Sequence, residues 1–256
     1  MERPLILLSN DDGYQATGLV ALRRELSELA DVIVCAPEAN QSATSHSLTL
    51  HRVLRLRRVE DGVFHVDGTP ADCVYVALSQ ASRVLPRTPD LCVSGLNHGL
   101  NLGVDVFYSG TVAAAREAAL RGVPGVALSA DAKADRTAAA SLGARIALEI
   151  LAALRASKTE TTPLLYNVNF PRGAAWSIRA TRLGKRTYDG DVDMRVDPRG
   201  GEYLWIGGSR AQHHDAPGSD TEAYDEGVVG ITPLSLDLSA PEGGAIATAA
   251  AGACSK

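Results

Sequence analysis

Short apolar runs alternate with longer amphipathic segments in the first half of the chain. Residues 4–9 (PLILLS) form a continuous apolar run, which is typical of a strand covered on both faces. A helix is predicted after this run, because four leucines recur at helical spacing with charged residues between them: Leu19, Leu22, Leu26 and Leu29. Residues 31–36 (DVIVCA) form a second apolar run, which Pro37 ends. Together the three segments predict a strand–helix–strand unit with a right-handed crossover.

The same alternation continues to about residue 155. Residues 68–80 predict a turn and then a helix, in which Thr69 caps the amino end and Pro70 takes the first helical position. The segments 47–59 and 63–66 predict an exposed ribbon. Further strands are predicted at 90–95 and 123–129, and further helices at 111–122 and 138–155.

Beyond about residue 163 the chain predicts strands rather than helices. Apolar segments separated by Gly, Pro and Asp occupy residues 164–171, 177–183, 202–208 and 227–238. We expect the tail at 243–256 to be frayed. The predicted fold class is α/β, with a Rossmann-like three-layer core, a mostly parallel sheet and a β-rich C-terminal extension. We expect one domain over residues 1–256, with the core at about 1–165 and an extension at about 166–240 that takes part in oligomerisation.

Length, charge and cysteine content narrow the class of protein. The 256 residues are enough to bury a sizeable core, and the net charge of -5 argues against binding to a nucleic-acid duplex. The basic run at 52–58 alternates with apolar residues, which favours a strand with one wet face over a DNA site. The apolar stretch from Leu5 to Leu8 is too short for a signal peptide or a membrane helix. The four cysteines contain no CxxC pair, so we expect free thiols in a cytoplasmic protein, without structural zinc.

Three polar loops follow the predicted strands, at residues 9–18, 36–47 and 94–111. Ligands of open α/β sheets bind beyond the carboxyl ends of the strands. We therefore expect these loops to converge on one site.

The first loop carries two adjacent carboxylates, Asp11 and Asp12, directly after a buried strand. Two such carboxylates repel each other and lose hydration, and a hard divalent cation removes both penalties. Gly13 allows the backbone to turn tightly beside them. The alternative is a capped turn that starts the next helix, and this motif alone leaves both interpretations open.

The third loop is rich in amide oxygens and glycine, with Asn97 and Asn101 among its members. Ser109, Gly110 and Thr111 then open a helix. Backbone N–H groups at a helix start, together with hydroxyl groups, form a cradle for phosphate. The alternatives are an ordinary turn for the Asn/Gly segment and simple capping for Ser109 or Thr111.

Several motifs taken together resemble one family. They are NDDG at 10–13, PEANQS at 37–42, GTPADCV at 68–74, the long block SGLNHGLNLGVDVFYSGTVAAAREA at 94–118, and GSDTEAYDEGVVGITPL at 218–234. The chain resembles the SurE family, the stationary-phase survival proteins that act as 5′-nucleotidases. The resemblance runs from about residue 4 to about residue 237, and the long block is its most specific part.

The resemblance implies a Rossmann-like core that holds one divalent cation per subunit, Mg²⁺ or Mn²⁺. On matching positions, the residues implied as metal ligands are Asp11, Asp12, Ser42 and Asn97. Asp11 and Asp12 are also implied as catalytic residues, together with Asn10. Asn10, Asn101, Ser109, Gly110 and Thr111 lie where the family handles phosphate.

The implied substrates are nucleoside 5′-monophosphates, with some tolerance for 3′-monophosphates and polyphosphate. The family also forms dimers or tetramers that exchange C-terminal elements between subunits. The mechanism expected from these features is metal-assisted hydrolysis, in which the cation offsets charge on the phosphoryl group and activates a water molecule.

The chain departs from the family pattern at two positions. Ala43 stands where Gly usually follows the metal-site Ser, so the backbone of that loop is expected to differ slightly. Ser235 follows TPL, where many relatives carry His. If that His assists protonation, this chain lacks the help or takes it from elsewhere, for example from Asp220.

The histidines and two rival functions complete the expectations. His46 and His98 lie in the candidate loops, where each is either a general acid or a hydrogen-bonded bystander, and His213 and His214 are read as solvated surface.

Two other functions compete with a metal-dependent nucleotidase. One is a phosphatase of the haloacid dehalogenase type, with a nucleophilic Asp after the first strand. The other is a regulatory nucleotide-binding module without turnover, although no GxGxxG motif follows that strand.

Overall fold

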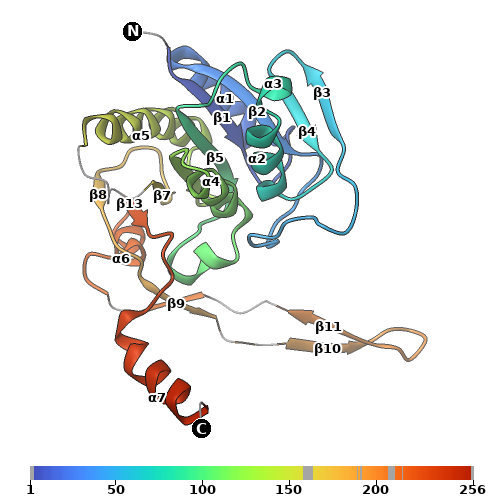
Figure 1. Cartoon of the computed structure of the whole chain (residues 1–256), viewed down its shortest axis with the longest axis vertical. Coiled ribbons are helices and arrows are strands. Elements are labelled where there is room, and N and C mark those ends of the chain that lie inside the picture. The colour runs from blue at the N-terminus through green and yellow to red at the C-terminus, as the bar shows by residue number, and fades with distance from the viewer. Residues whose placement is uncertain are drawn as a thin grey trace.

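The computed structural model describes residues 3–157, 164–188, 190, 192–206, 211–214 and 216–254. Within these residues a central sheet has nine strands, of which most are parallel (Figure 1). In spatial order they are β3 (Leu56–Glu60), β4 (Val63–Val66), β2 (Asp31–Pro37), β1 (Leu5–Ser9), β5 (Leu91–His98), β6 (Gly125–Ala130), β7 (Leu165–Phe170), β13 (Val229–Leu234) and β8 (Ile178–Ala180). Three strands run the other way: β3 is antiparallel to β4, β13 is antiparallel to β7, and β8 is parallel to β13.

Helices cover both faces of this sheet and make three layers. Alternate residues of β1 face opposite layers, which is why Leu5 to Leu8 are all apolar: Ile6 and Leu8 pack with one pair of helices and Leu7 with the other. The first pair is α1 (Thr17–Leu29) and α5 (Arg136–Ala156), and the second is α2 (Pro70–Ser79) and α4 (Gly110–Leu120). The predicted α/β fold class is therefore confirmed.

Two helices show how local sequence sets these layers. The Thr69 hydroxyl accepts a hydrogen bond from the Asp72 amide, and the Asp72 carboxylate accepts one from the Thr69 amide, so a capping box starts α2 where the sequence predicts it. By length and composition α5 could cross a membrane, but its apolar face packs in the core through residues such as Ala144, Ala147 and Ile150.

Strand order brings the three candidate loops together. Strand β1 lies between β2 and β5, and it is parallel to both. The loops after these three neighbouring strands therefore leave the same edge of the sheet, as the sequence predicts.

Smaller elements extend the second half of the chain. The helices are α3 (Ala81–Val84), η1 (Gly103–Phe107), α6 (Asp220–Asp225), η2 (Pro241–Gly243) and α7 (Gly244–Cys254). Strand β9 (Lys185–Tyr188) pairs with β12 (Ala211–His214), and β10 (Val192–Val196) pairs with β11 (Glu202–Ile206) in a hairpin that projects away from the core (Figure 1).

Three expectations differ from the structure. Strand β4 is buried along its whole length, because β2 and β3 flank it and α2 packs over it, whereas β3 is exposed as predicted. Residues 47–55 form no strand. The tail is not frayed over residues 244–254, which form α7, although none of that helix is buried. Residues 207–208 of one predicted strand and 255–256 of the tail lie outside the described residues.

Candidate active site

Asp11 is the most buried carboxylate of the candidate site. Its residue is 4% exposed, and its Oδ1 accepts a hydrogen bond from the Thr111 hydroxyl at the start of α4. Burial raises the pKa of Asp11 to about 6; the Thr111 hydrogen bond opposes that shift, and the neighbouring Asp12 charge adds to it. Gly110 makes the approach of α4 possible, since a Cβ there would lie 2.8 Å from Asp11 Cβ.

Asp12 connects the other two loops. Its Oδ1 accepts a hydrogen bond of 3.3 Å from Asn40 Nδ2 in the loop after β2, and its Oδ2 accepts one of 3.4 Å from the His98 amide at the end of β5. The Gln41 amide also donates to the Asp11 carbonyl at 2.7 Å. The three loops thus meet at the carboxylate pair.

Ser42 and Asn97 each lie next to these contacts. The Ser42 amide donates to Asn40 Oδ1 at 2.8 Å, which ties Ser42 to the side chain that touches Asp12. Asn97 precedes His98, and its side-chain nitrogen donates to the Gly99 carbonyl at 2.9 Å. The amide oxygen of Asn97 is therefore the atom available to a cation.

Asn10 has a local role in the structure. Its side chain donates to the Gly13 carbonyl at 2.9 Å and accepts from the Gly13 amide at 3.2 Å, so it closes the turn that carries both aspartates. Gly13 has a φ of +103°, a conformation that favours glycine. Asn10 thereby positions Asp11 and Asp12, and its catalytic role stays a prediction.

The helix start combines the capping and cradle interpretations. The Ser109 hydroxyl accepts a hydrogen bond of 3.1 Å from the Val112 amide and caps α4. The amides of Gly110 and Thr111 have no partner within the helix, since the first turn of any helix leaves them unpaired. The start of α4 lies beside Asp11, the Thr111 amide interacts with the Asp11 carboxylate, and the positive end of a helix dipole favours an anion.

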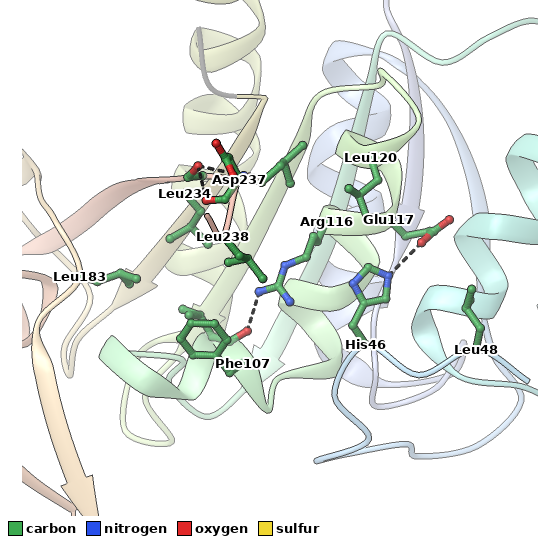
Figure 2. Close-up of a pocket in the computed structure, with 13 residues that line it drawn as sticks. His46, Leu48, Phe107, Arg116, Glu117, Leu120, Leu183, Leu234, Asp237 and Leu238 are labelled. Atoms are coloured by element: carbon green, nitrogen blue, oxygen red, sulfur yellow. Dashed lines mark hydrogen bonds and ion pairs between the residues drawn. The ribbon is translucent and has the colours of Figure 1, made fainter. Parts of the chain in front are cut away.

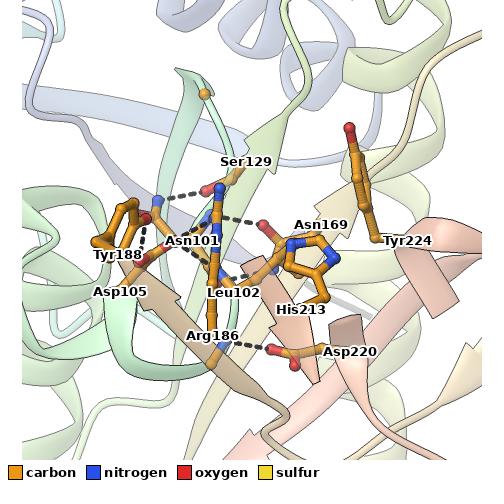
Figure 3. A network of polar contacts seen from close by, with 12 residues as sticks. Asn101, Leu102, Asp105, Ser129, Asn169, Arg186, Tyr188, His213, Asp220 and Tyr224 are labelled. Atoms are coloured by element: carbon orange, nitrogen blue, oxygen red, sulfur yellow. Dashed lines mark hydrogen bonds and ion pairs between the residues drawn. The ribbon is translucent and has the colours of Figure 1, made fainter. Parts of the chain in front are cut away.

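Asn101 lies in a buried polar network (Figure 3), and its predicted role in phosphate binding stays a prediction. Its side-chain nitrogen donates to Ser129 Oγ at 2.7 Å, and its amide donates to Asn169 Oδ1 at 2.8 Å. Its carbonyl accepts hydrogen bonds from the side chains of Asn167 and Asn169. This network holds the third loop on β6 and β7.

A second anchor of the third loop was not predicted from the sequence. Asp105 accepts hydrogen bonds from Arg186 and from the Tyr188 hydroxyl, so β9 clamps η1 (Figure 3). Asp220 accepts from the Gly103 amide at 3.0 Å and from the Gly184 amide at 2.7 Å. Asp220, proposed above as a substitute proton donor, is thus engaged in anchoring the loop. In the sequence, this contact was indicated only by the carboxylate of Asp220, at the start of the segment 218–234.

The chemistry of the site fits a hard divalent cation. Asp11, Asp12, Ser42 and Asn97 offer carboxylate, hydroxyl and amide oxygens, which Mg²⁺ and Mn²⁺ prefer. Among the described residues no Lys or Arg forms an ion pair with either aspartate. No cluster of three or more His, Cys, Asp or Glu suited to a metal occurs in the described part of the chain, so the amide and hydroxyl donors are needed to complete a ligand set.

Comparison with known proteins decides the family. The model of the family described as survival protein SurE matches residues 6–190. The protein named 5′-nucleotidase SurE from Sorangium cellulosum (strain So ce56) is 65% identical over 240 residues, which cover 94% of this chain and 93% of that protein. The chain belongs to the SurE family.

Two further relatives agree with this assignment. The 5′-nucleotidase SurE of Myxococcus xanthus (strain DK1622) is 46% identical over 235 residues, covering 91% of this chain and 88% of that protein. The crystal structure of the SurE protein from Aquifex aeolicus is similar with a TM-score of 0.77 and 36% identity, over 94% of this chain and 96% of that one. Membership of the SurE family rules out the haloacid dehalogenase class.

The structure explains one departure from the SurE pattern. Ala43 has a φ of +59°, in the left-handed region that glycine adopts without steric cost. The loop keeps the backbone of a glycine although the residue is alanine. This backbone carries a steric cost for alanine, and the expected difference from relatives stays a prediction.

Four histidines singled out in the sequence lie in different environments, and of these His214 is exposed as predicted, with its Nε2 2.8 Å from the Thr187 hydroxyl. His46 Nε2 lies 2.9 Å from Glu117 Oε2, which makes its bystander interpretation the better supported one. His98 is exposed and contacts Asp12 through its backbone. His213 is not simple solvated surface, because its Nδ1 lies 2.9 Å from Asp225 Oδ1 and its ring packs edge-on to Tyr224, 5.7 Å between centroids.

Proposed function

We propose that this chain is a metal-dependent phosphatase that hydrolyses nucleoside 5′-monophosphates to nucleoside and phosphate. The observation that carries the proposal is the Asp11–Asp12 pair, without a positive side chain among its described contacts, directly beside the start of α4. A cation and a phosphate satisfy these two features together. The relatives named 5′-nucleotidase SurE support the same activity.

The proposed site assigns a role to each residue. Asp11, Asp12, Ser42 and Asn97 would hold one Mg²⁺ or Mn²⁺ per subunit. When bound, this cation supplies Lewis-acid stabilisation of the phosphoryl oxygens and lowers the pKa of water.

The protein's own groups place the substrate against that centre. The start of α4 at Ser109, Gly110 and Thr111 would bind the remaining phosphate oxygens, and the Thr111 hydroxyl orients Asp11. Asp11 or Asp12 orients the attacking water and takes its proton.

A phosphate-release assay tests this proposal. We expect the purified protein to release phosphate from nucleoside 5′-monophosphates with Mg²⁺ or Mn²⁺, more slowly from 3′-monophosphates and polyphosphate, and not at all with excess chelator. Restoring the divalent ion should restore the rate. Undiminished turnover in chelator would exclude the metal centre, and binding of nucleotide without turnover in any divalent ion would favour the regulatory-module alternative.

We further propose a homodimer or homotetramer in the cytoplasm. Large apolar side chains are exposed on the β10–β11 hairpin and on the segment that follows β13 and includes α7. They are Val192, Met194, Val196, Tyr203, Leu204, Trp205, Ile206, Leu238 and Ile246. Exposed apolar surface on two projecting elements is typical of an interface. A cavity of about 600 Å³ beside α4, lined by residues such as Leu120, Leu234 and Leu238, offers further apolar surface (Figure 2). The buried free thiols Cys35, Cys73 and Cys92 suit a reducing compartment.

Removal of α7 tests the assembly. A chain ended after Ser239 lacks the exposed apolar helix α7. We therefore expect fewer subunits per particle than for the full chain, as measured by light scattering coupled to gel filtration. Replacing the exposed Trp205 by Ser on the hairpin should act in the same direction. A full-length chain with the mass of a monomer at micromolar concentration would contradict the proposed oligomer.

A further inference from the structure

Two consecutive aromatic residues lie exposed where η1 meets α4. Phe107 is 50% exposed and Tyr108 is 65% exposed. Tyr108 directly precedes Ser109, the cap of α4, and stands two residues before Gly110, which packs on Asp11. An exposed aromatic residue therefore stands directly before the proposed phosphate cradle in the chain.

The backbone that carries Tyr108 is held from both sides. Its amide donates to the Asp105 carbonyl at 3.0 Å, and its carbonyl accepts from the Ser45 amide at 3.1 Å. The Ser45 hydroxyl also donates to the Phe107 carbonyl at 2.6 Å. Tyr108 thus joins the loop that carries Ser42 to the loop that carries Asn97, and a side chain on such a support needs little further ordering to bind a ligand.

Within the described part of the chain Tyr108 has a free ring, and unlike the exposed Tyr203 and Trp205 of the projecting β10–β11 hairpin it lies at the start of α4. Tyr75 lies under the Arg121 guanidinium, and the Tyr188 hydroxyl donates to Asp105. The Phe107 ring lines the apolar cavity beside α4, in which Figure 2 shows it near Arg116. No described residue stacks on the Tyr108 ring or bonds to its hydroxyl, and Tyr108 does not line that cavity.

We propose that Tyr108 is the platform on which the nucleobase of the substrate stacks. This inference rests on the proposed function, because it gives a binding residue to the base of the nucleoside monophosphate whose phosphate the start of α4 would hold. Stacking on a ring face tolerates every base, since each base has a π face. Tyr108 is accordingly a residue that binds nucleoside and selects nucleotides over smaller phosphate esters, without a role in the chemical step.

Kinetics of Tyr108→Ala test the platform. We expect KM for a nucleoside 5′-monophosphate to rise about 10-fold or more with kcat little changed, as expected when binding is lost equally from ground and transition states. The inhibition constant of ribose 5-phosphate, a competitor that keeps sugar and phosphate but lacks the base, should stay within about two-fold, the scatter expected where no contact is lost. Tyr108→Phe keeps the ring and should keep the wild-type KM.

Phe107→Ala is the matched control, because it removes a neighbouring exposed ring that lines the apolar cavity beside α4. Its KM for the nucleotide should stay near that of the wild type. An unchanged KM in Tyr108→Ala would overturn the platform, as would an equal weakening of ribose 5-phosphate, which would indicate a disturbed phosphate cradle. A wild-type protein that releases no phosphate from nucleotides in Mg²⁺ or Mn²⁺ would instead refute the proposed function itself.

Discussion

Asp11→Asn is expected to lose at least about three orders of magnitude in phosphate release while the protein stays folded. The amide lacks the negative charge of the carboxylate and so holds a hard cation more weakly. Stabilisation of the phosphoryl charge by that cation is worth several kcal/mol, at about 1.4 kcal/mol per tenfold in rate. The side chain remains isosteric, so it still fits against Gly110 and Thr111. Release of phosphate in excess Mg²⁺ or Mn²⁺ measures the loss, and circular dichroism checks the fold.

The same substitution should stabilise the metal-free protein. The pKa of Asp11 rises from 3.8 to about 6 on folding, mainly because burial disfavours its charged form. Because the folded-state pKa is the higher one, the favourable contribution of protonated Asp11 is complete below pH 3.8 and is lost as pH rises through about 6. Asn carries no charge at any of these pH values, so at pH 7 Asp11→Asn should unfold with a free energy on the order of 3 kcal/mol higher than the wild type.

Urea unfolding in chelator between pH 4 and pH 8 measures this difference. We expect the two proteins to converge near pH 4 and to separate as pH rises. Glu28→Gln, at an exposed carboxylate of α1, is the control and should follow the wild type throughout. A gap between wild type and Asp11→Asn that does not change with pH would show that the burial of charge at Asp11 is not the cause.

Gly110→Ala should impair both the site and the fold. A Cβ at this position would lie 2.8 Å from Asp11 Cβ and 3.1 Å from Pro70 Cγ, so the start of α4 or the carboxylate must shift. Alanine favours a helix by up to about 1 kcal/mol over glycine. Overpacking costs about 1–3 kcal/mol and should win here, since Asp11 Cβ is attached to a backbone held by Gln41.

A displacement of about 1 Å at a catalytic group costs about a hundredfold in rate, so we expect a loss of that size in phosphate release from Gly110→Ala. Gly252→Ala provides the control, because that glycine lies in α7 with open space around it. Its activity should match the wild type. A Gly110→Ala variant with full activity and unchanged stability would mean that α4 does not need this close approach to Asp11.

The sequence alone determined the elements whose signals are local. The continuous apolar run of β1 predicts burial on both faces, and the Thr69–Pro70 pair predicts the start of α2. Because β1, β2 and β5 are parallel neighbours, the predicted strands also imply that their loops share one edge. The candidate ligands could thus be assigned to one site before any contact was known.

Only the tertiary structure decided which of these groups touch. Thr111 bonds to Asp11 across 100 positions of sequence, and Asn101 turns to Ser129 and Asn169 rather than to the carboxylates. The burial of β4 and the exposure of α7 likewise depend on which elements pack over them. Apolar periodicity and capping act within a few residues and are written in the local sequence, whereas these contacts depend on strand order and on how closely two helices and a sheet edge can pack, which no single segment specifies.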